Sequence, residues 1–326
     1  MAVSGQVTCR EAIAQAIADE LEADPDVIFF GEDVGAAGGV FKSTVGLFER
    51  FGGERVRDTP ISEQAIVGTA IGAAIMGLRP IAEIMFADFA GVAFDQIANQ
   101  LAKYRYLTGG QASLPVTVRM ANGAGAGFAA QHSQSTENWF LNVPGLKIAV
   151  PGTVEDCYGL LRAAVRDENP VLVFEHKNLL GLKGTIPSLP CRLGEALVVR
   201  PGRDVTVVAT QQMRHRALEA ADRLVGEGID LEVIDPRTLV PFDDETVAGS
   251  LARTARLLVV QEGPPGGGWG ASLIARMAEG HFDCFDVPPR LLASAETPIP
   301  YAGCLEDAWM PGSDDVMQAA RELVES

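Results

Sequence analysis

The chain has 326 residues and a formal net charge of -17 at pH 7. This length allows two domains with separate cores, and the negative charge disfavours nucleic acid or an anionic membrane as a partner, because both would be repelled over most of the surface. The five cysteines are odd in number, scattered and never in a C-x-x-C pair, which indicates reduced thiols and excludes a disulfide framework or a zinc site of the usual spacing.

The amino terminus has no basic segment followed by an apolar run, and the longest apolar helix is too short to span a bilayer. We therefore expect a cytoplasmic protein. That helix carries Gly68 and Gly72 in a G-x-x-x-G spacing, which permits close approach of another helix and suggests a subunit contact.

The chain opens with a helix, because Thr8 and Glu11 form a capping-box pattern before an amphipathic run. Short apolar strands then alternate with helical stretches, an order that predicts a mainly parallel sheet with helices on both faces. The expected strands are 27–30, 81–86, 116–120, 147–150 and 171–174, and the expected helices between them include 65–78, 92–107 and 154–166.

Between Lys183 and Gly194 the periodic pattern is lost at a glycine and two prolines, which predicts a linker. We expect a first domain at 1–184, a linker at 185–194 and a smaller α/β domain at 195–326. In the second domain the expected strands are 205–209, 231–234 and 257–260, and the expected helices are 216–225, 245–252 and 271–278.

Glu63 is the one charge at the amino-terminal end of the nearly all-apolar helix expected at 65–78. The helix dipole favours an anion there by roughly 0.3–1 kcal/mol, whereas apolar surroundings raise the cost of ionising it. These opposed effects suit a carboxyl group that shares or passes a proton. The alternative is a first-turn acid that only complements the dipole, and the local sequence leaves both interpretations open.

Two histidines are candidates for proton transfer. His132 lies among hydrogen-bonding side chains on an expected loop, and His176 follows the strand expected at 171–174, where it could face a cleft. The alternative for His132 is a surface residue in a polar loop. Ser133 and Ser135 lack a nucleophile-elbow motif, so a serine hydrolase has little support.

A glycine-rich segment, 122–127, follows the strand expected at 116–120. It lacks the helix start and the later acid that a dinucleotide-binding loop requires, so we reject that interpretation. No P-loop motif is present either. A tightly approached or mobile backbone is the safer prediction.

Five segments occur in a particular order and spacing: Gly31-Glu32-Asp33-Val34, Asp58-Thr59-Pro60-Ile61-Ser62-Glu63, Gly77-Leu78-Arg79-Pro80, Ala130-Gln131-His132-Ser133-Gln134 and Pro144-Gly145-Leu146-Lys147. Together they resemble the beta subunit of thiamin-diphosphate-dependent 2-oxo acid dehydrogenases. The resemblance continues through Arg166-Asp167, Asn169-Pro170, Asp235-Pro236-Arg237-Thr238 and Pro300-Tyr301-Ala302, so it covers nearly the whole chain.

The resemblance implies a pyrimidine-binding domain followed by a transketolase carboxyl-terminal domain. Glu63 would hydrogen-bond the aminopyrimidine ring of thiamin diphosphate and help it reach the imino tautomer that removes the thiazolium proton. Phe89 would stack on the pyrimidine and Ile61 would pack beside it. His132 would line the substrate channel, where it would transfer protons or orient the lipoyl group.

The resemblance also implies metal sites and partners. Val116, Ala164, Asp167 and Asn169 match positions around a structural potassium ion. The chain has no Gly-Asp-Gly motif of the kind that holds magnesium and diphosphate. A separate alpha subunit would therefore hold that magnesium, in an alpha2beta2 heterotetramer that is inactive without it. The further partner would be a lipoyl acyltransferase core, whose basic binding domain could dock on the acidic surface.

Within the family, Val92 stands where pyruvate dehydrogenases typically carry glutamine, and the run after His176 is more similar to acetoin dehydrogenase. We therefore expect C–C cleavage of acetoin or a related 2-oxo compound, with acyl transfer to lipoamide. A pyruvate or branched-chain 2-oxo acid dehydrogenase subunit is the alternative. Two others are a transketolase or deoxyxylulose phosphate synthase fragment, which the missing phosphate-sugar motifs disfavour, and a non-catalytic scaffold.

Overall fold

The computed structural model describes residues 5–187 and 189–326, which form two compact units. Unit 1 comprises the described residues up to Asn122 together with Trp139–Leu193, and unit 2 comprises Gly123–Asn138 and Gly194–Ser326. The expected first domain begins with residues 1–4 and the expected linker contains Ser188, and these five residues lie outside the described part of the chain. The glycine-rich segment from Gly123 onward and His132 therefore belong to unit 2.

Unit 1 contributes six parallel strands in the order β6-β7-β5-β4-β2-β3. Their bounds are β2 Val27–Gly31, β3 Val56–Asp58, β4 Arg79–Phe86, β5 Thr117–Asn122, β6 Lys147–Ala149 and β7 Val171–His176. A separate antiparallel pair joins β1 (Val7–Thr8) to β8 (Lys183–Gly184). All five predicted strands of the first domain are present, and their ends lie close to the expected ones.

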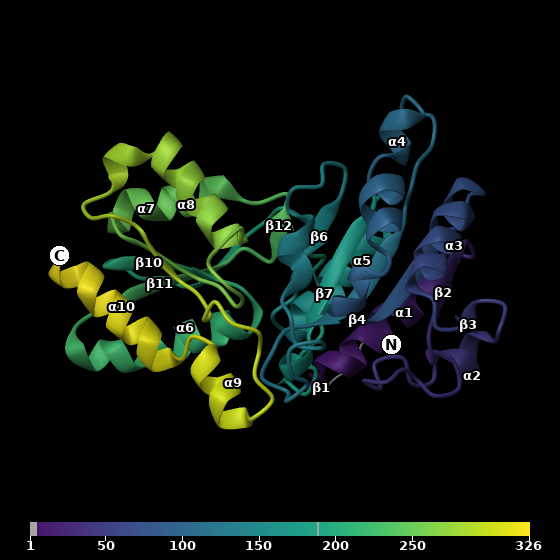
Figure 1. Cartoon of the computed structure of the whole chain (residues 1–326), viewed down its shortest axis with the longest axis horizontal. Helices are drawn as coiled ribbons and strands as arrows, with labels where there is room; N and C mark the ends of the chain where they lie inside the picture. Colours follow the sequence, from purple (N-terminus) through teal and green to yellow (C-terminus); the bar gives the residue numbers. More distant parts are fainter. Residues whose placement is uncertain (1–4, 188) are drawn as a thin grey trace. The chain divides into compact units, whose positions relative to one another are not determined.

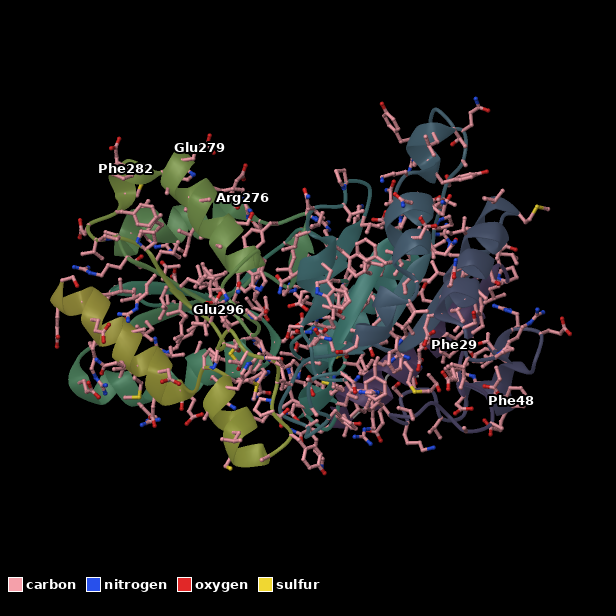
Figure 2. The ribbon with its side chains drawn as sticks, in the orientation of Figure 1. Phe29, Phe48, Arg276, Glu279, Phe282 and Glu296 are labelled. Carbon is pink, nitrogen blue, oxygen red and sulfur yellow. The ribbon has the colours of Figure 1, made fainter. Side chains whose placement is uncertain are left out.

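Both faces of this sheet are covered, as the apolar strands predict. Alternate residues such as Phe29 and Val173 join one core with α1 (Cys9–Ala23) and α5 (Val154–Val165), whereas their neighbours Phe30 and Phe174 are buried outside that core. Figure 2 labels Phe29 within the ribbon of unit 1. The remaining α-helices of unit 1 are α2 (Leu47–Phe51), α3 (Glu63–Ile75) and α4 (Tyr104–Leu107).

Two helix predictions for unit 1 need correction. The single helix expected at 92–107 is instead a 3-10 turn at Ala87–Gly91, a π-helical turn at Gln96–Leu101 and the short α4. The helix expected at 65–78, α3, runs from Glu63 to Ile75. Its nearly all-apolar sequence predicts burial on every side. One side is open instead, and Met76 at its end is 83% exposed. Composition identified an apolar helix but not which side this chain leaves uncovered.

Unit 2 has a second, mainly parallel sheet with strand order β14-β13-β10-β11-β9, in which only β9 is antiparallel. Its strands are β9 Leu197–Arg200, β10 Val205–Ala209, β11 Leu231–Asp235, β13 Leu257–Val260 and β14 Arg290–Leu292. A further short strand, β12 (Thr238–Val240), is not part of this sheet. Helices α6 (Gln211–Leu224) and α10 (Ser313–Glu325) cover one face, and α7 (Asp244–Thr254) and α8 (Trp269–Gly280) the other (Figure 1). Helix α9 spans Gly303–Trp309. This confirms an α/β fold in both units.

No helix in the described part of the chain is long and apolar enough to cross a membrane.

Candidate functional site

The predicted site residues Glu63 and Phe89 lie at one edge of the unit 1 sheet, together with Glu32. Strands β4, β2 and β3 are parallel neighbours, so their carboxyl ends meet at this edge. Glu32 directly follows β2, Phe89 lies in the turn after β4, and Glu63 begins α3 after β3. Ligands of open parallel sheets bind beyond the carboxyl ends of the strands, which makes this edge the candidate site.

The loops at this edge are held by close backbone contacts. The Gly35 N–H donates to Asp58 Oδ1 at 2.6 Å, and the Thr59 N–H donates to the Gly31 carbonyl at 2.9 Å. A Cβ on Gly35 would lie 2.6 Å from Asp58 Oδ2, so a side chain at position 35 would displace the Asp58 carboxylate. The sequence around Asp58 therefore fixes the path of the chain into α3.

Glu63 is the first residue of α3 and is 8% exposed. The preceding residue, Ser62, makes no side-chain cap to the helix. Among residues 5–187 and 189–326, none donates a hydrogen bond to the Glu63 carboxylate or forms an ion pair with it. A carboxyl group buried to this extent normally has a hydrogen-bond partner. The geometry fits a carboxyl that meets a ligand, as the ring nitrogen of thiamin diphosphate would require.

A second carboxyl group, Glu32, is electrostatically linked to Glu63. Burial raises the pKa of Glu32 above its ordinary value, and the charges of Asp33 and Glu63 raise it further. Glu32 stands in one of the sequence motifs, but nothing in that motif indicated a role for it. Two neighbouring carboxyl groups of which one ionises reluctantly are typical of a proton-handling site.

Aromatic side chains line the same edge beyond β4. The ring centroids of Phe86 and Phe89 lie 5.5 Å apart in an edge-to-face arrangement, and Phe41 meets Phe86 in the same way at 5.3 Å. Phe89 is half-buried, whereas Ile61 is 76% exposed. A half-buried aromatic ring with an aromatic neighbour and an exposed aliphatic side chain fit the stacking and packing roles that the resemblance implies for Phe89 and Ile61.

The other predicted catalytic residue, His132, lies on the Gly123–Asn138 segment of unit 2. It is half-buried, and its backbone N–H donates to the Ala129 carbonyl at 3.4 Å. His176 ends β7 and is buried, and its Nδ1 accepts the Asn178 N–H at 3.3 Å, which caps the following turn. That contact gives His176 a structural function in the chain.

Three of the expected potassium ligands, Ala164, Asp167 and Asn169, are joined by hydrogen bonds in unit 1. The Ala164 carbonyl accepts the Asp167 N–H at 3.2 Å, and Asp167 Oδ1 accepts two N–H groups of Asn169 at 2.9 Å. The Val116 carbonyl accepts the N–H of Val171 at 3.0 Å.

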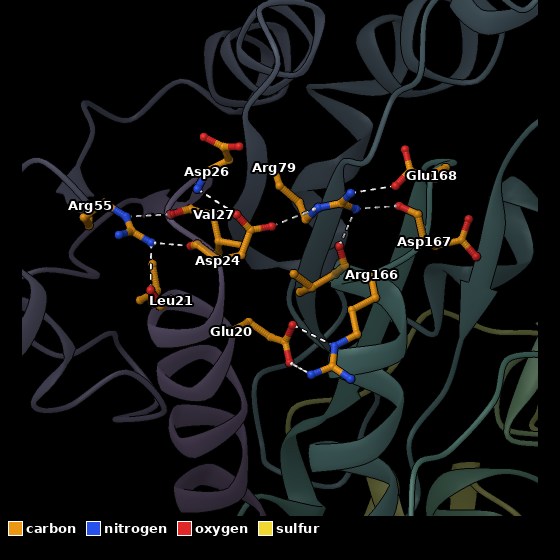
Figure 3. Close-up of polar contacts among 11 residues, drawn as sticks. Glu20, Leu21, Asp24, Asp26, Val27, Arg55, Arg79, Arg166, Asp167 and Glu168 are labelled. Atoms are coloured by element: carbon orange, nitrogen blue, oxygen red, sulfur yellow. Dashed lines mark hydrogen bonds and ion pairs between the residues drawn. The ribbon is translucent and has the colours of Figure 1, made fainter.

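Three cationic side chains contact this group. Lys147 pairs with the Asp167 carboxylate, and Arg105 Nη1 donates to Asn169 Oδ1 at 2.6 Å. Arg79 Nη1 donates to the Asp167 carbonyl at 3.2 Å, a contact that Figure 3 shows. Burial raises the pKa of Asp167, but the hydrogen bonds from Lys147 and Asn169 outweigh this and hold it below its ordinary value. The carbonyl oxygens fit a hard cation through their second lone pairs, whereas the carboxylate is already neutralised.

In the described ranges, no group of three or more His, Cys, Asp and Glu side chains is arranged to hold a metal ion. All five cysteines are free thiols.

Comparison with known proteins identifies both units. Residues 5–183 match the transketolase pyrimidine-binding domain, and residues 194–316 match the transketolase C-terminal domain. A solved chain described as a split gene transketolase in an inactive beta4 tetramer has the same fold, with a TM-score of 0.82, 25% identity, and coverage of 98% of this chain and 99% of that chain.

Curated relatives are similar over almost the full length. The acetoin:2,6-dichlorophenolindophenol oxidoreductase subunit beta of Cupriavidus necator is 45% identical, covering 98% of each chain. Its counterpart in Bacillus subtilis is 42% identical, covering 98% of this chain and 97% of that one. The mitochondrial pyruvate dehydrogenase E1 component subunit beta-2 of Oryza sativa is 42% identical, covering 98% of this chain and 87% of that one. The chain thus belongs to the family of the beta subunits of thiamin-diphosphate-dependent acetoin and 2-oxo acid dehydrogenases.

Proposed function

We propose that this chain is the beta subunit of a thiamin-diphosphate-dependent dehydrogenase that cleaves a C–C bond of acetoin or a related 2-oxo compound and transfers the acyl unit to lipoamide. The observation that carries the proposal is Glu63, a carboxyl group 8% exposed at the start of an apolar helix that receives no hydrogen bond from any described residue. The similarity to acetoin oxidoreductase beta subunits supports the substrate class.

Thiamin diphosphate, when bound, would supply a carbon nucleophile for the substrate carbonyl and a sink for the electrons of the C–C bond that is cleaved. Glu63 would hold a proton against the pyrimidine ring nitrogen, which needs a carboxyl group within hydrogen-bond reach. Phe89 and Ile61 would orient the ring and exclude water from it. His132 would hold or move a proton on the substrate side or orient the lipoyl arm.

An alpha subunit in an alpha2beta2 assembly would supply the magnesium and diphosphate contacts, and a lipoyl acyltransferase core would accept the acyl unit. Val116, Ala164, Asp167 and Asn169 would hold a structural potassium ion through their oxygen atoms. We also propose the boundaries 1–184, 185–194 and 195–326 for the pyrimidine-binding domain, linker and C-terminal domain. These boundaries assign the 123–138 segment by sequence order to the first domain, although its contacts are with unit 2.

The second candidate is a pyruvate dehydrogenase E1 beta subunit, which the 42% identity to the Oryza sativa protein favours. Turnover of acetoin and pyruvate decides between them. The assay would contain thiamin diphosphate, magnesium and an artificial electron acceptor, and would use this chain co-expressed with a candidate alpha subunit and this chain alone. Activity only in the pair is expected, with acetoin preferred. Activity of the chain alone would contradict the shared site, and assembled pairs inactive on every ketone tested would favour the scaffold.

A further inference from the structure

Two buried carboxylates of unit 2 accept hydrogen bonds from the glycine-rich segment that precedes His132. Glu306 Oε1 accepts the Gly125 N–H at 2.8 Å, and its Oε2 accepts the Gly127 N–H at 3.1 Å. Glu262 Oε1 accepts the Ala124 N–H at 2.6 Å and the Ser135 hydroxyl at 3.0 Å. Both carboxylates are buried. Four hydrogen bonds to anionic acceptors therefore join this segment to the rest of unit 2.

The backbone of the segment is shaped to present these N–H groups. Gly123, Gly125 and Gly127 have positive φ values of 87°, 88° and 73°, which glycine adopts without steric cost. Successive N–H groups in such a backbone form a concave site for an anion. Here the anions are side chains of the same chain, so the segment is neither a phosphate loop nor a free, mobile glycine loop.

The segment is also anchored by packing and at its far end. Ala124 is fully buried against Ile299, Trp309 and Met310, and Trp309 lies in the same helix, α9, as Glu306. At the other end, the Asn138 Oδ1 accepts the Trp269 N–H at 3.0 Å. His132 thus lies on a stretch that is held on both sides, by the contacts of the glycines before it and by those of Ser135 and Asn138 after it.

We propose that Glu262 and Glu306 are positioning residues that fix the His132 segment through its backbone N–H groups. The role of His132 itself rests on the proposed function above. Charge-assisted hydrogen bonds of this kind are about twice as strong as neutral ones. If the segment moved away, both the buried carboxylates and the backbone N–H groups would lose their partners, which is energetically unfavourable. Residues distant in sequence would therefore control the position of the segment that carries His132.

The test compares Glu306→Gln with Glu296→Gln in the assembled alpha–beta enzyme. The amide of the first variant places an NH2 group against one backbone N–H, so it cannot accept both bonds. Glu296 is an exposed carboxylate of the same unit, labelled in Figure 2, and serves as the matched control. Ser135→Ala is a milder variant that removes one donor to Glu262 and leaves both carboxylates in place, in case Glu306→Gln does not fold.

Two readouts separate positioning from a general loss of structure. Amide hydrogen exchange in peptides spanning 123–138 should become at least about tenfold faster in Glu306→Gln, because the protecting bonds open more often, while peptides of the unit 2 sheet remain unchanged. The kcat/KM should fall by about ten- to a hundredfold, the effect of a small displacement of a reacting group. Glu296→Gln should match wild type in both readouts.

Unchanged amide exchange in 123–138 for both Glu306→Gln and Ser135→Ala would overturn the proposal. Provided that His132→Ala inactivates the enzyme, faster exchange in Glu306→Gln with an unchanged kcat/KM would overturn it as well. If His132→Ala retains full activity, the assigned role of His132 fails instead, and the exchange readout still shows whether the carboxylates hold the segment.

Discussion

Arg119 on β5 holds Glu175 on the neighbouring strand β7 through two parallel hydrogen bonds, from Nε at 2.9 Å and from Nη2. A second carboxylate, Glu83 on β4, binds Nη1 of the same guanidinium, and Ser43 accepts from Nη2 at 3.0 Å. Burial raises the pKa of Glu83, and the charge of Arg119 lowers it without overcoming that effect. One cation therefore serves two buried carboxyl groups within the same sheet that carries the candidate site at its edge.

This arrangement predicts different costs for removing the two acids. Glu175→Gln should lower the free energy of unfolding by about 3–5 kcal/mol, since it breaks a buried two-point ion pair. Glu83→Gln should cost less than half of that, because Arg119 keeps its stronger partner and the raised pKa already favours a neutral carboxyl at position 83. Urea unfolding of the two variants checks the order, and equal losses would contradict it.

The same cluster predicts a pH dependence. A group whose folded pKa is raised binds more protons in the folded than in the unfolded state, so its contribution to stability decreases as pH rises above its ordinary value of 4.5 toward the folded pKa. Wild type should lose stability relative to Glu83→Gln over that interval. A stability difference between them that stays constant from about pH 4 to about pH 8, measured by urea unfolding, would mean that Glu83 does not titrate in this way.

Gly145, in a motif that the sequence shares with the family, has a clear structural reason to be glycine. Its φ is +105°, and a Cβ would lie 2.0 Å from the Ala102 carbonyl oxygen. Gly145→Ala should therefore destabilise by more than about 3 kcal/mol, combining backbone strain with a steric clash. Gly110 is the matched control, because its φ is +82° and a Cβ there would meet no atom within 4 Å.

Gly110→Ala should cost only about 1–2 kcal/mol, the strain of the left-handed backbone alone. Thermal and urea unfolding of both variants give the comparison. Similar losses for the two would show that strain dominates at both positions and that the approach of Ala102 to Gly145 is looser than its geometry indicates.

Val92 directly follows the turn that carries Phe89, and it is 61% exposed. It offers no hydrogen bond to a substrate carboxylate, which favours a neutral ketone such as acetoin. Val92→Gln should raise kcat/KM for pyruvate relative to acetoin by about tenfold, the value of one added hydrogen bond to a charged group. Val92→Leu changes size without adding a donor and should leave the ratio unchanged, so an equal shift in both variants would point to pocket size instead.

The sequence predicted the fold well where burial determines the pattern. The strands ending near Phe30, Phe86 and Phe174 are buried on both faces and therefore appear as short apolar runs. The helices α9 and α10 were not predicted, although α10 repeats apolar residues such as Val316, Ala320 and Leu323 along one face. The 92–107 stretch was predicted as one helix because composition does not reveal a π-helical turn.

The candidate site was predictable only in part. Glu63 could be found because a lone carboxylate at the start of an apolar helix is a local signal, and the structure places it there. Glu306 and Glu262 could not, because they meet the glycine-rich segment from 179 to 181 and from 127 to 138 positions away in sequence. The three glycines indicated an unusual backbone but not what occupies it.

The most direct test of the proposed function is turnover by the Glu63→Gln variant in the assembled alpha–beta enzyme, with thiamin diphosphate, magnesium and the preferred substrate. The amide keeps the shape of the side chain but cannot exchange a proton as a carboxyl does, so kcat should fall by at least about a hundredfold. Glu49→Gln, at an exposed acid of unit 1, should retain wild-type turnover. Turnover of an assembled Glu63→Gln enzyme within about twofold of wild type would contradict the catalytic role of this carboxyl group.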